Sequence, residues 1–166
     1  MSTQHPPRLV IIDDDPKLAG IVSMIAREAY PDTRELVLES VITAEAAILA
    51  IRRISEERET AIVVISDFHL PPSQVDGLQI LAEAQRRIPT AKRVLMTGRD
   101  PEELASVLAE ARLDAFVTKP FTFDEMRALI ERLVREVVEE TAVAGRSVPV
   151  ATNEGRPWTR TGTTLS

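Results

Sequence analysis

Residues 8–16 read RLVIIDDDP, and this stretch decides what kind of fold the chain can adopt. Its aliphatic run, Leu9–Ile12, is short and unbroken, as expected of a strand that is covered on both faces of a parallel sheet. Three aspartates follow, and Pro16 then suits the first turn of a helix that Asp15 can cap. The stretch therefore predicts a buried strand that ends in an acidic loop and passes directly into a helix.

The same pattern recurs along the chain, where short apolar runs alternate with longer stretches of helical period. Such alternation is typical of parallel strands joined by crossover helices. Five strands are predicted, at Arg8–Ile12, Glu35–Leu38, Ala61–Ser66, Arg93–Met96 and Ala115–Thr118. The second is the most polar and is predicted to lie at an edge. The sequence thus predicts an α/β fold built on one five-stranded parallel sheet.

Five helices are predicted from apolar spacing and from capping residues. Their predicted starts are Pro16, the region of Thr43, the region of Leu78, Asp100-Pro101, and Thr122. The last helix has the clearest pattern, because Thr122 and Glu125 fit a capping box and apolar residues follow at helical spacing.

The composition changes at Thr141 to Gly, Pro, Thr, Ser and Arg without a period. Residues 141–166, with the lone Trp158, are therefore predicted to form a mobile tail. A flexible N-terminus is predicted for residues 1–7, which leaves residues 8–140 as the folded domain. No output domain follows in this sequence, so the protein either works through partners as a single-domain regulator or belongs to a longer protein.

Composition excludes several classes of function. The chain has no cysteine, which rules out disulfides and thiolate chemistry and makes a cytoplasmic location the expectation. Neither a signal peptide nor an apolar run of membrane-spanning length is present, so no membrane association is expected. The net charge is -6, and the tail is basic, so the body is more acidic still; direct nucleic-acid binding is not expected.

Polar residues stand at the carboxyl ends of four predicted strands, where open α/β sheets bind ligands. They are Asp13-Asp14-Asp15, Asp67, Thr97 and Lys119. Carboxylates that close repel each other by about 4 kcal/mol per pair at ~4 Å, so the cluster would attract a cation. Oxygen ligands favour Mg²⁺, which commonly binds phosphate together with one or two carboxylates. One carboxylate could then attack phosphorus while Lys119 and Thr97 hold the phosphoryl oxygens.

Four motifs in this order make the chain resemble the receiver domain of two-component response regulators. They are LVIIDDDP (9–16), VVISDFHLP (63–71), VLMTG (94–98) and FVTKPF (116–121). The resemblance covers residues 8–140 and implies a flavodoxin-like, doubly wound sheet of order 2-1-3-4-5 with helices on both faces. It also implies that the protein catalyses only its own phosphorylation and dephosphorylation and is otherwise not an enzyme.

The resemblance also implies a role for each site residue. Asp67 would be the phospho-acceptor, and Thr97 and Lys119 would hold the phosphoryl group. The Mg²⁺ ligands would be Asp13 through water, Asp14, Asp67 and the backbone carbonyl of His69. Thr97 and Phe116 would form the switch that reports phosphorylation.

Partners are implied as well. A histidine kinase or phosphotransfer protein would donate the phosphoryl group. A downstream protein would bind the face of the fourth helix, fifth strand and fifth helix, and a homodimer formed on phosphorylation is a further option.

Two alternatives stay open. In a haloacid-dehalogenase-like phosphatase Asp13 would be the nucleophile and Asp15 the acid, but Pro16 stands where that family prefers Thr or Val, and no late acidic pair follows Lys119-Pro120. A receiver-like docking module that is not phosphorylated is the second alternative. It is kept open by the segment 72–76, which is about two residues longer than the family usually has.

Overall fold

The computed structural model describes residues 5–164 of the chain, with side chains described as far as Gly145. Five parallel strands form one sheet of order β2-β1-β3-β4-β5, which confirms the predicted fold class. The strands are β1 (Arg8–Ile12), β2 (Val37–Val41), β3 (Ile62–Asp67), β4 (Lys92–Thr97) and β5 (Ala115–Thr118). The helices are α1 (Pro16–Ala29), α2 (Ala44–Glu56), α3 (Gly77–Arg87), α4 (Ala105–Ala111) and α5 (Phe123–Thr164).

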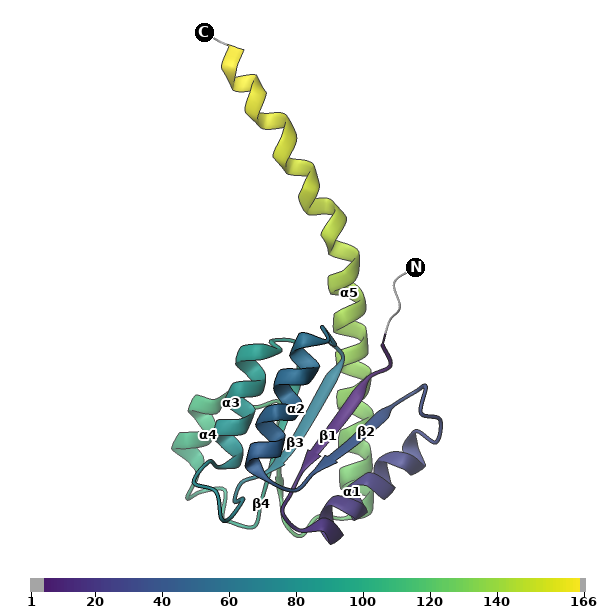
Figure 1. Cartoon of the computed structure of the whole chain (residues 1–166), viewed down its shortest axis with the longest axis vertical. Helices are drawn as coiled ribbons and strands as arrows, with labels where there is room; N and C mark the ends of the chain where they lie inside the picture. Colours follow the sequence, from purple (N-terminus) through teal and green to yellow (C-terminus); the bar gives the residue numbers. More distant parts are fainter. Residues whose placement is uncertain (1–4, 165–166) are drawn as a thin grey trace.

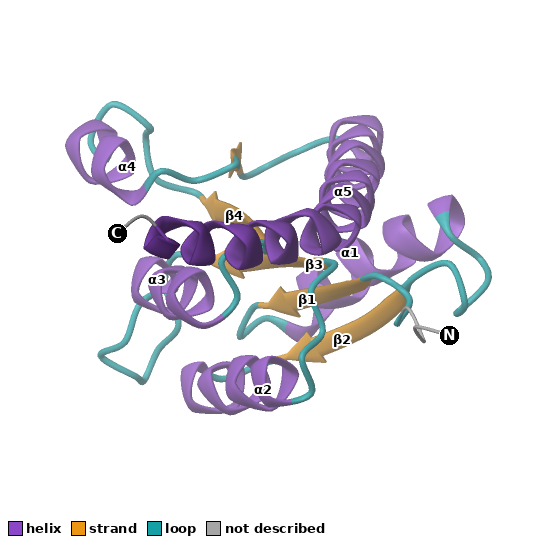
Figure 2. Cartoon of the chain, turned by 90° about the horizontal axis from the view of Figure 1, so that it is seen from above, coloured by secondary structure: helices purple, strands orange, loops and turns teal. Residues whose placement is uncertain are grey.

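The sheet lies between two layers of helices, with α1 and α5 on one side and α2 and α3 on the other (Figure 1, Figure 2). Side chains that alternate along each strand point to opposite layers. On β1, Val10 belongs to the core under α2 and α3, whereas Leu9 and Ile11 belong to the core under α1 and α5. The continuous apolar runs in the sequence are therefore explained by burial on both faces.

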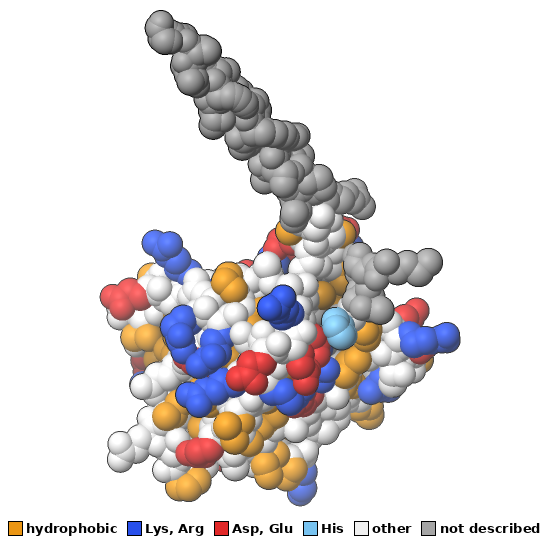
Figure 3. All heavy atoms as spheres, turned by 45° about the horizontal axis from the view of Figure 1, so that its top comes forward, with side chains coloured by type: hydrophobic (Ala, Val, Ile, Leu, Met, Phe, Trp, Pro, Cys, Tyr) orange, Lys and Arg blue, Asp and Glu red, His pale blue; other side chains and the backbone are white. Residues whose placement is uncertain are grey.

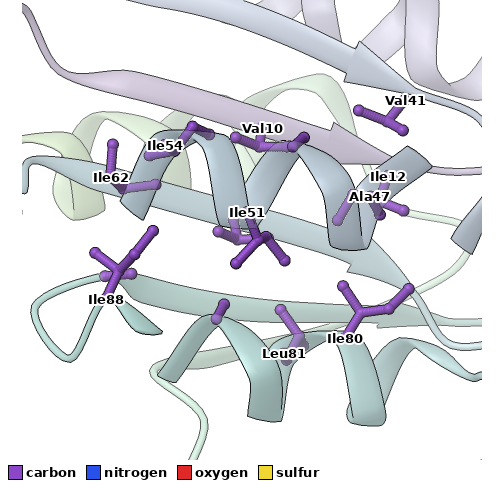
Figure 4. Close-up of a cluster of buried hydrophobic side chains, with 14 of the residues drawn as sticks. Val10, Ile12, Val41, Ala47, Ile51, Ile54, Ile62, Ile80, Leu81 and Ile88 are labelled. Atoms are coloured by element: carbon purple, nitrogen blue, oxygen red, sulfur yellow. The ribbon is translucent and has the colours of Figure 1, made fainter. Parts of the chain in front are cut away.

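Figure 4 shows the core beneath α2 and α3, where helix side chains such as Ile51 and Leu81 point toward strand side chains such as Val10. All three are fully buried. Burial of each such aliphatic side chain stabilises the fold by about 1.5–3 kcal/mol. These cores cover both faces of the sheet. The carboxyl ends of the strands lie outside the cores, so polar side chains can gather there.

Helix starts follow the predicted caps in most cases. The Asp15 carboxylate accepts a hydrogen bond from Lys17 N at the start of α1, and Thr43 caps α2 through Ala46 N. The capping box predicted at the start of α5 is present, since Thr122 and Glu125 each accept a hydrogen bond from the backbone N–H of the other. These caps set the points at which the loops carrying polar residues pass into helices.

The predicted second strand began two residues and ended three residues too early. It was expected at Glu35–Leu38, but the backbone N–H groups of Glu35 and Leu36 both donate to the carbonyl of Asp32. A turn therefore occupies these positions, and Leu36 is buried within it. β2 then pairs with β1 along its whole length, from Val37 to Val41, as the edge strand that the sequence led us to expect.

The predicted start of the fourth helix was also wrong. Asp100 does accept a hydrogen bond from the N–H of Glu102, as a cap would. The next bonds, however, join residues three apart, such as Leu104 N to the Pro101 carbonyl, and so make a tight turn. α4 begins only at Ala105, and none of its seven residues is buried.

α5 runs from Phe123 to Thr164 and leaves the domain at the edge of the sheet opposite the carboxyl ends of the strands (Figure 1). It thus continues through the segment predicted to be a mobile tail. That segment contains Pro149 and Pro157, residues that cost a helix interior about 3 kcal/mol each. Its mobility stays a prediction, and the side chain of Trp158 lies outside the described residues.

Candidate functional site

Two carboxylates meet because of the register between β1 and β3. Ile12 is paired with Ser66, so that Asp13 and Asp67 follow side by side at the carboxyl edge of the sheet. Asp13 is 1% exposed and Asp67 is 9% exposed. Asp14 is exposed, and one ligand atom from each of these three aspartates lies within 4.8 Å of the others. The predicted acidic cluster is therefore assembled by the fold.

Lys119 bridges the two buried carboxylates. Its Nζ atom lies 3.1 Å from Oδ2 of Asp13 and 3.0 Å from Oδ1 of Asp67. The residue follows β5, and its backbone N–H donates to the carbonyl of Thr97 over 2.8 Å, which ties the lysine to the end of β4. The Lys119-Pro120 peptide bond is cis. Residues separated by 106 positions in the chain thus form one charged group.

Thr97 ends β4 at the same edge and is 2% exposed. Its Oγ1 atom accepts a hydrogen bond of 3.0 Å from the backbone N–H of Arg99. The Arg99 guanidinium lies 5.6 Å from the ring centroid of Phe68, a distance that suits a cation–π contact. The loop after β4 is therefore connected both to the threonine and to the residue that follows Asp67.

Gly77 allows the Asp67 loop to close against α3. A Cβ atom at this position would lie 2.0 Å from the carbonyl oxygen of Asp67 and 3.0 Å from Oγ of Ser66. The N–H of Gly77 also donates to the carbonyl of Phe68 over 2.8 Å. Only a residue without a side chain permits this approach. The helix start therefore fixes the backbone that carries Asp67.

Burial raises the pKa of the Asp67 carboxyl group, and the nearby Asp13 raises it further. Lys119 and the N–H of Phe68 act in the opposite direction but do not cancel the rise. For Lys119, burial favours the neutral amine, yet hydrogen bonds to Asp67 and Asp13 outweigh burial, and its pKa is raised. The site therefore keeps a firmly charged ammonium beside two carboxylates.

The donor set of the cluster fits a hard divalent cation. All three aspartates offer oxygen ligands, and two of them are buried, so that a single ammonium leaves uncompensated negative charge. Asp14 is free of the Lys119 bridge, and its exposure would let a hydrated ion approach. Mg²⁺ keeps several waters and suits such a partly open group of carboxylates.

Other predicted site residues are placed less tightly. His69 is exposed in the loop after β3, and its carbonyl as a metal ligand stays a prediction. Phe116 is partly buried on β5 and packs against the core under α2 and α3. Sequence reasoning did not identify Gly77 or Phe68 as structural parts of the site. Gly77 is the first residue of α3, although glycine is a poor helix former. A glycine at the start of a predicted helix could therefore have indicated a close approach of the backbone.

The fold and the site together define a doubly wound α/β domain with an acidic, lysine-bridged pocket at its strand ends. The family model for the response regulator receiver domain matches residues 9–131. The chain belongs to this family.

The transcriptional regulatory protein GlrR of Escherichia coli K12 is 28% identical over 143 residues, which are 86% of this chain and 28% of GlrR. The probable transcriptional regulatory protein TcrX of Mycobacterium tuberculosis H37Rv is 30% identical over 147 residues, 88% of this chain and 57% of TcrX. This chain therefore spans less than two thirds of either relative.

Solved structures agree on the fold. A CheY-like receiver domain protein from Methanospirillum hungatei JF-1 has a TM-score of 0.66 and 23% identity, with 81% of this chain and 98% of that chain covered. NtrX from Brucella abortus, in complex with ADP, has a TM-score of 0.67 and 22% identity, with 84% of this chain and 29% of that chain covered. In the part of the chain that the structure describes, no helix is long and apolar enough to cross a membrane.

Proposed function

We propose that the domain accepts a phosphoryl group on Asp67 from a phosphohistidine of a kinase or phosphotransfer protein and signals the change to a protein partner. The observation that carries this proposal is the Lys119 bridge, which holds two buried carboxylates at 3.1 and 3.0 Å from one ammonium. So much buried charge is costly for folding alone. A role in binding an anionic group would account for this cost.

In the proposed reaction a carboxylate oxygen of Asp67 attacks phosphorus. The bond from phosphorus to the donor nitrogen breaks, and its electron pair leaves with the histidine, which then takes a proton from solvent. Both hydrogen bonds described for the Asp67 carboxylate, from Lys119 and from the N–H of Phe68, reach Oδ1. Oδ2 is therefore the oxygen that is available to react.

The charge of the transferred group has to be balanced. Lys119 can turn from the carboxylates to a phosphoryl oxygen, because its Nζ atom already lies within hydrogen-bond distance of Asp67. Thr97 can donate its hydroxyl hydrogen to a second oxygen, since Oγ1 acts only as an acceptor toward Arg99. Asp13, Asp14 and Asp67 would hold Mg²⁺, which when bound supplies positive charge to the phosphoryl oxygens.

The output would pass through the face formed by α4, β5 and α5. Phosphorylation adds about two negative charges at the carboxyl edge of the sheet and so favours movement of Thr97 toward the site. Phe116 lies on β5 beside β4, because Leu95 and Phe116 are paired. Movement of the loop after Thr97 would change the space into which Phe116 can turn.

The test is the intact mass of the full chain after incubation with Mg²⁺ and acetyl phosphate. We expect the wild type to gain the mass of one phosphoryl group and Asp67→Asn to gain none. Asp124→Asn, which changes an exposed aspartate on α5, is the matched control and should behave as the wild type. Chelation of Mg²⁺ should abolish the gain. If the wild type gains no mass, the docking module that is not phosphorylated replaces this proposal.

A further inference from the structure

An arginine lies in the interior of the sheet, where a charged side chain is costly. Arg93, on β4, is 5% exposed, and burial lowers its pKa. Its guanidinium donates from Nη2 to the carbonyl of Arg112 over 2.6 Å and from Nη1 to the carbonyl of Ala111 over 3.3 Å. Both acceptors lie at the C-terminal end of α4, where backbone carbonyls lack helical partners and favour a cation.

The backbone of Arg93 strengthens this connection. Its N–H donates to Oδ2 of Asp114 over 2.8 Å, and the N–H of Asp114 donates to its carbonyl over 3.0 Å. Arg112, which follows the last residue of α4, adopts the left-handed conformation that favours glycine, with φ of 50°. Four directional hydrogen bonds therefore attach the end of α4 and the start of β5 to β4.

The N-terminal end of α4 is attached differently. The capping residue, Leu104, makes no side-chain hydrogen bond to the helix, and it is held by burial, with 4% exposure. Apolar contact is not directional and tolerates sliding. This end follows the turn after Thr97 and Arg99, so that along the chain it lies closer to the site than the C-terminal end of α4 does.

We infer that Arg93 is a fixed anchor for the C-terminal end of α4, about which phosphorylation of Asp67 turns the helix, so that its N-terminal end moves most. The inference rests on the proposed function. It gives Arg93 a positioning role in the output, because a rotation about a fixed end changes the direction of the exposed surface of α4, including Val107, relative to β5. A helix free at both ends would transmit no defined direction.

The first experiment needs no mutation. Hydrogen exchange of the full chain is measured with Mg²⁺, in the presence and absence of beryllofluoride, a mimic of the phosphoryl group. We expect the exchange rates of the backbone amides in segment 99–106, which Pro101 does not contribute to, to change and those of amides 109–114 to stay the same. Equal changes at both ends of α4 would overturn the inference.

The second experiment removes the anchor. In Arg93→Met the two hydrogen bonds of the guanidinium are lost and the two of the Arg93 backbone remain, so exchange at 109–114 should rise about tenfold without beryllofluoride, the effect of a net loss of about 1.4 kcal/mol. The effect of beryllofluoride should then spread from 99–106 to 109–114, a change that a purely structural cap would not produce. Arg93→Lys keeps the charge without the two-pronged geometry and should be intermediate. Arg132→Met, which changes an arginine half exposed on α5, is the control.

The outcomes separate this inference from the proposed function. If the wild type gains no phosphoryl group and does not respond to beryllofluoride, the proposed function fails and the rotation fails with it. If the wild type is phosphorylated but 109–114 exchange equally in the wild type, Arg93→Met and Arg93→Lys, the anchor alone is disproved. If Arg93→Met does not fold, as shown by the lack of a cooperative unfolding transition, the exchange rates of Arg93→Lys and of the wild type with and without beryllofluoride test the anchor instead.

Discussion

Lys119 illustrates at the scale of a single residue why the site has to be completed by the fold. Its ammonium is the described partner of two carboxylates, one directly after β1 and one at the end of β3. Carboxylates at such short separation repel strongly once they are removed from water. The lysine thus offsets the repulsion between the two carboxylates, and in the proposed reaction the same ammonium would already lie beside the incoming phosphoryl group.

Gly77 provides the clearest prediction at this scale. In Gly77→Ala the new Cβ would lie 2.0 Å from the carbonyl oxygen of Asp67, so the backbone of the β3–α3 loop has to shift. We expect a loss of stability of about 2–4 kcal/mol, the range of severe steric changes, together with slower phosphorylation by acetyl phosphate. Thermal and denaturant unfolding measure the first effect, and intact mass against time measures the second.

Gly20→Ala is the matched control for that substitution. Gly20 is exposed within α1, and a Cβ there meets no atom within 4 Å. Because alanine is the better helix former, this change should stabilise the protein by about 0.5–1 kcal/mol. A destabilisation of similar size in both variants would show that the close approach at Asp67 has no special cost.

At the scale of elements, an ion-pair network connects the amino end of β1 to its neighbours. Arg8 donates from Nε and Nη2 to Glu59, at 2.9 Å each, and from Nη1 to Glu39 on β2, also at 2.9 Å. The Glu59 side chain is 5% exposed. Burial would raise the pKa of Glu59, but Arg8 outweighs burial, and the pKa is lowered. The network therefore attaches the amino end of β1, which lies at the edge of the sheet away from the site, to β2 and to the residues before β3.

This network predicts a pH dependence of stability. Because the pKa of Glu59 is lower in the folded state than in the unfolded chain, its contribution is complete above the unfolded value, about 4.3, and is lost as the pH falls through the lower folded value. Glu59→Gln should reduce the free energy of unfolding by about 1–3 kcal/mol at neutral pH. The difference from the wild type should shrink in denaturant titrations toward pH 3. Glu56→Gln, an exposed change on α2, should show no such difference at either pH.

Elements differ in how well the sequence predicted them. β1 and β5 were predicted with their observed bounds, because short aliphatic runs beside turn residues have few other interpretations. β2 was misplaced because a turn at Asp32 competes with strand propensity, and pairing with β1 decides between them. α4 was misplaced because Asp100-Pro101 is equally good as the start of a tight turn.

The gathering of Asp13, Asp67 and Lys119 at one edge of the sheet was predicted because topology brings the strand ends together. The contacts between loops were not predicted. The Arg99–Phe68 contact, for example, depends on loop conformations that no local sequence pattern specifies.

At the scale of the whole molecule, the buried side chains described for the two cores stop well before the end of α5. Among the residues whose side chains are described, which end at Gly145, the last buried residue of α5 is Val137, and both core clusters lie within residues 9–137. The surface drawn in Figure 3 shows positive and negative side chains interspersed among the described residues. Within the part of the chain whose side chains are described, both cores are thus formed by residues up to Val137.

We therefore predict that a chain truncated after Gly145 keeps the stability and the phosphorylation of the full chain. The measurements are the midpoint of thermal unfolding and the intact mass after acetyl phosphate. A midpoint lower by more than about 4 °C, equivalent to roughly 1 kcal/mol, would show that residues 146–166 pack against the domain. A second truncation, after Leu133, removes part of the core and should unfold the protein.

The contact between Arg99 and Phe68 has a practical consequence for spectroscopy. The only tryptophan of the chain, Trp158, lies beyond Gly145, and the only tyrosine, Tyr30, ends α1 at the edge of the sheet opposite Asp67. The natural fluorophores are therefore remote from the site in sequence or in space. In Phe68→Trp an indole would stand directly after Asp67 and beneath a guanidinium. Its emission should shift when acetyl phosphate and Mg²⁺ are added, so that phosphoryl transfer could be followed continuously by fluorescence.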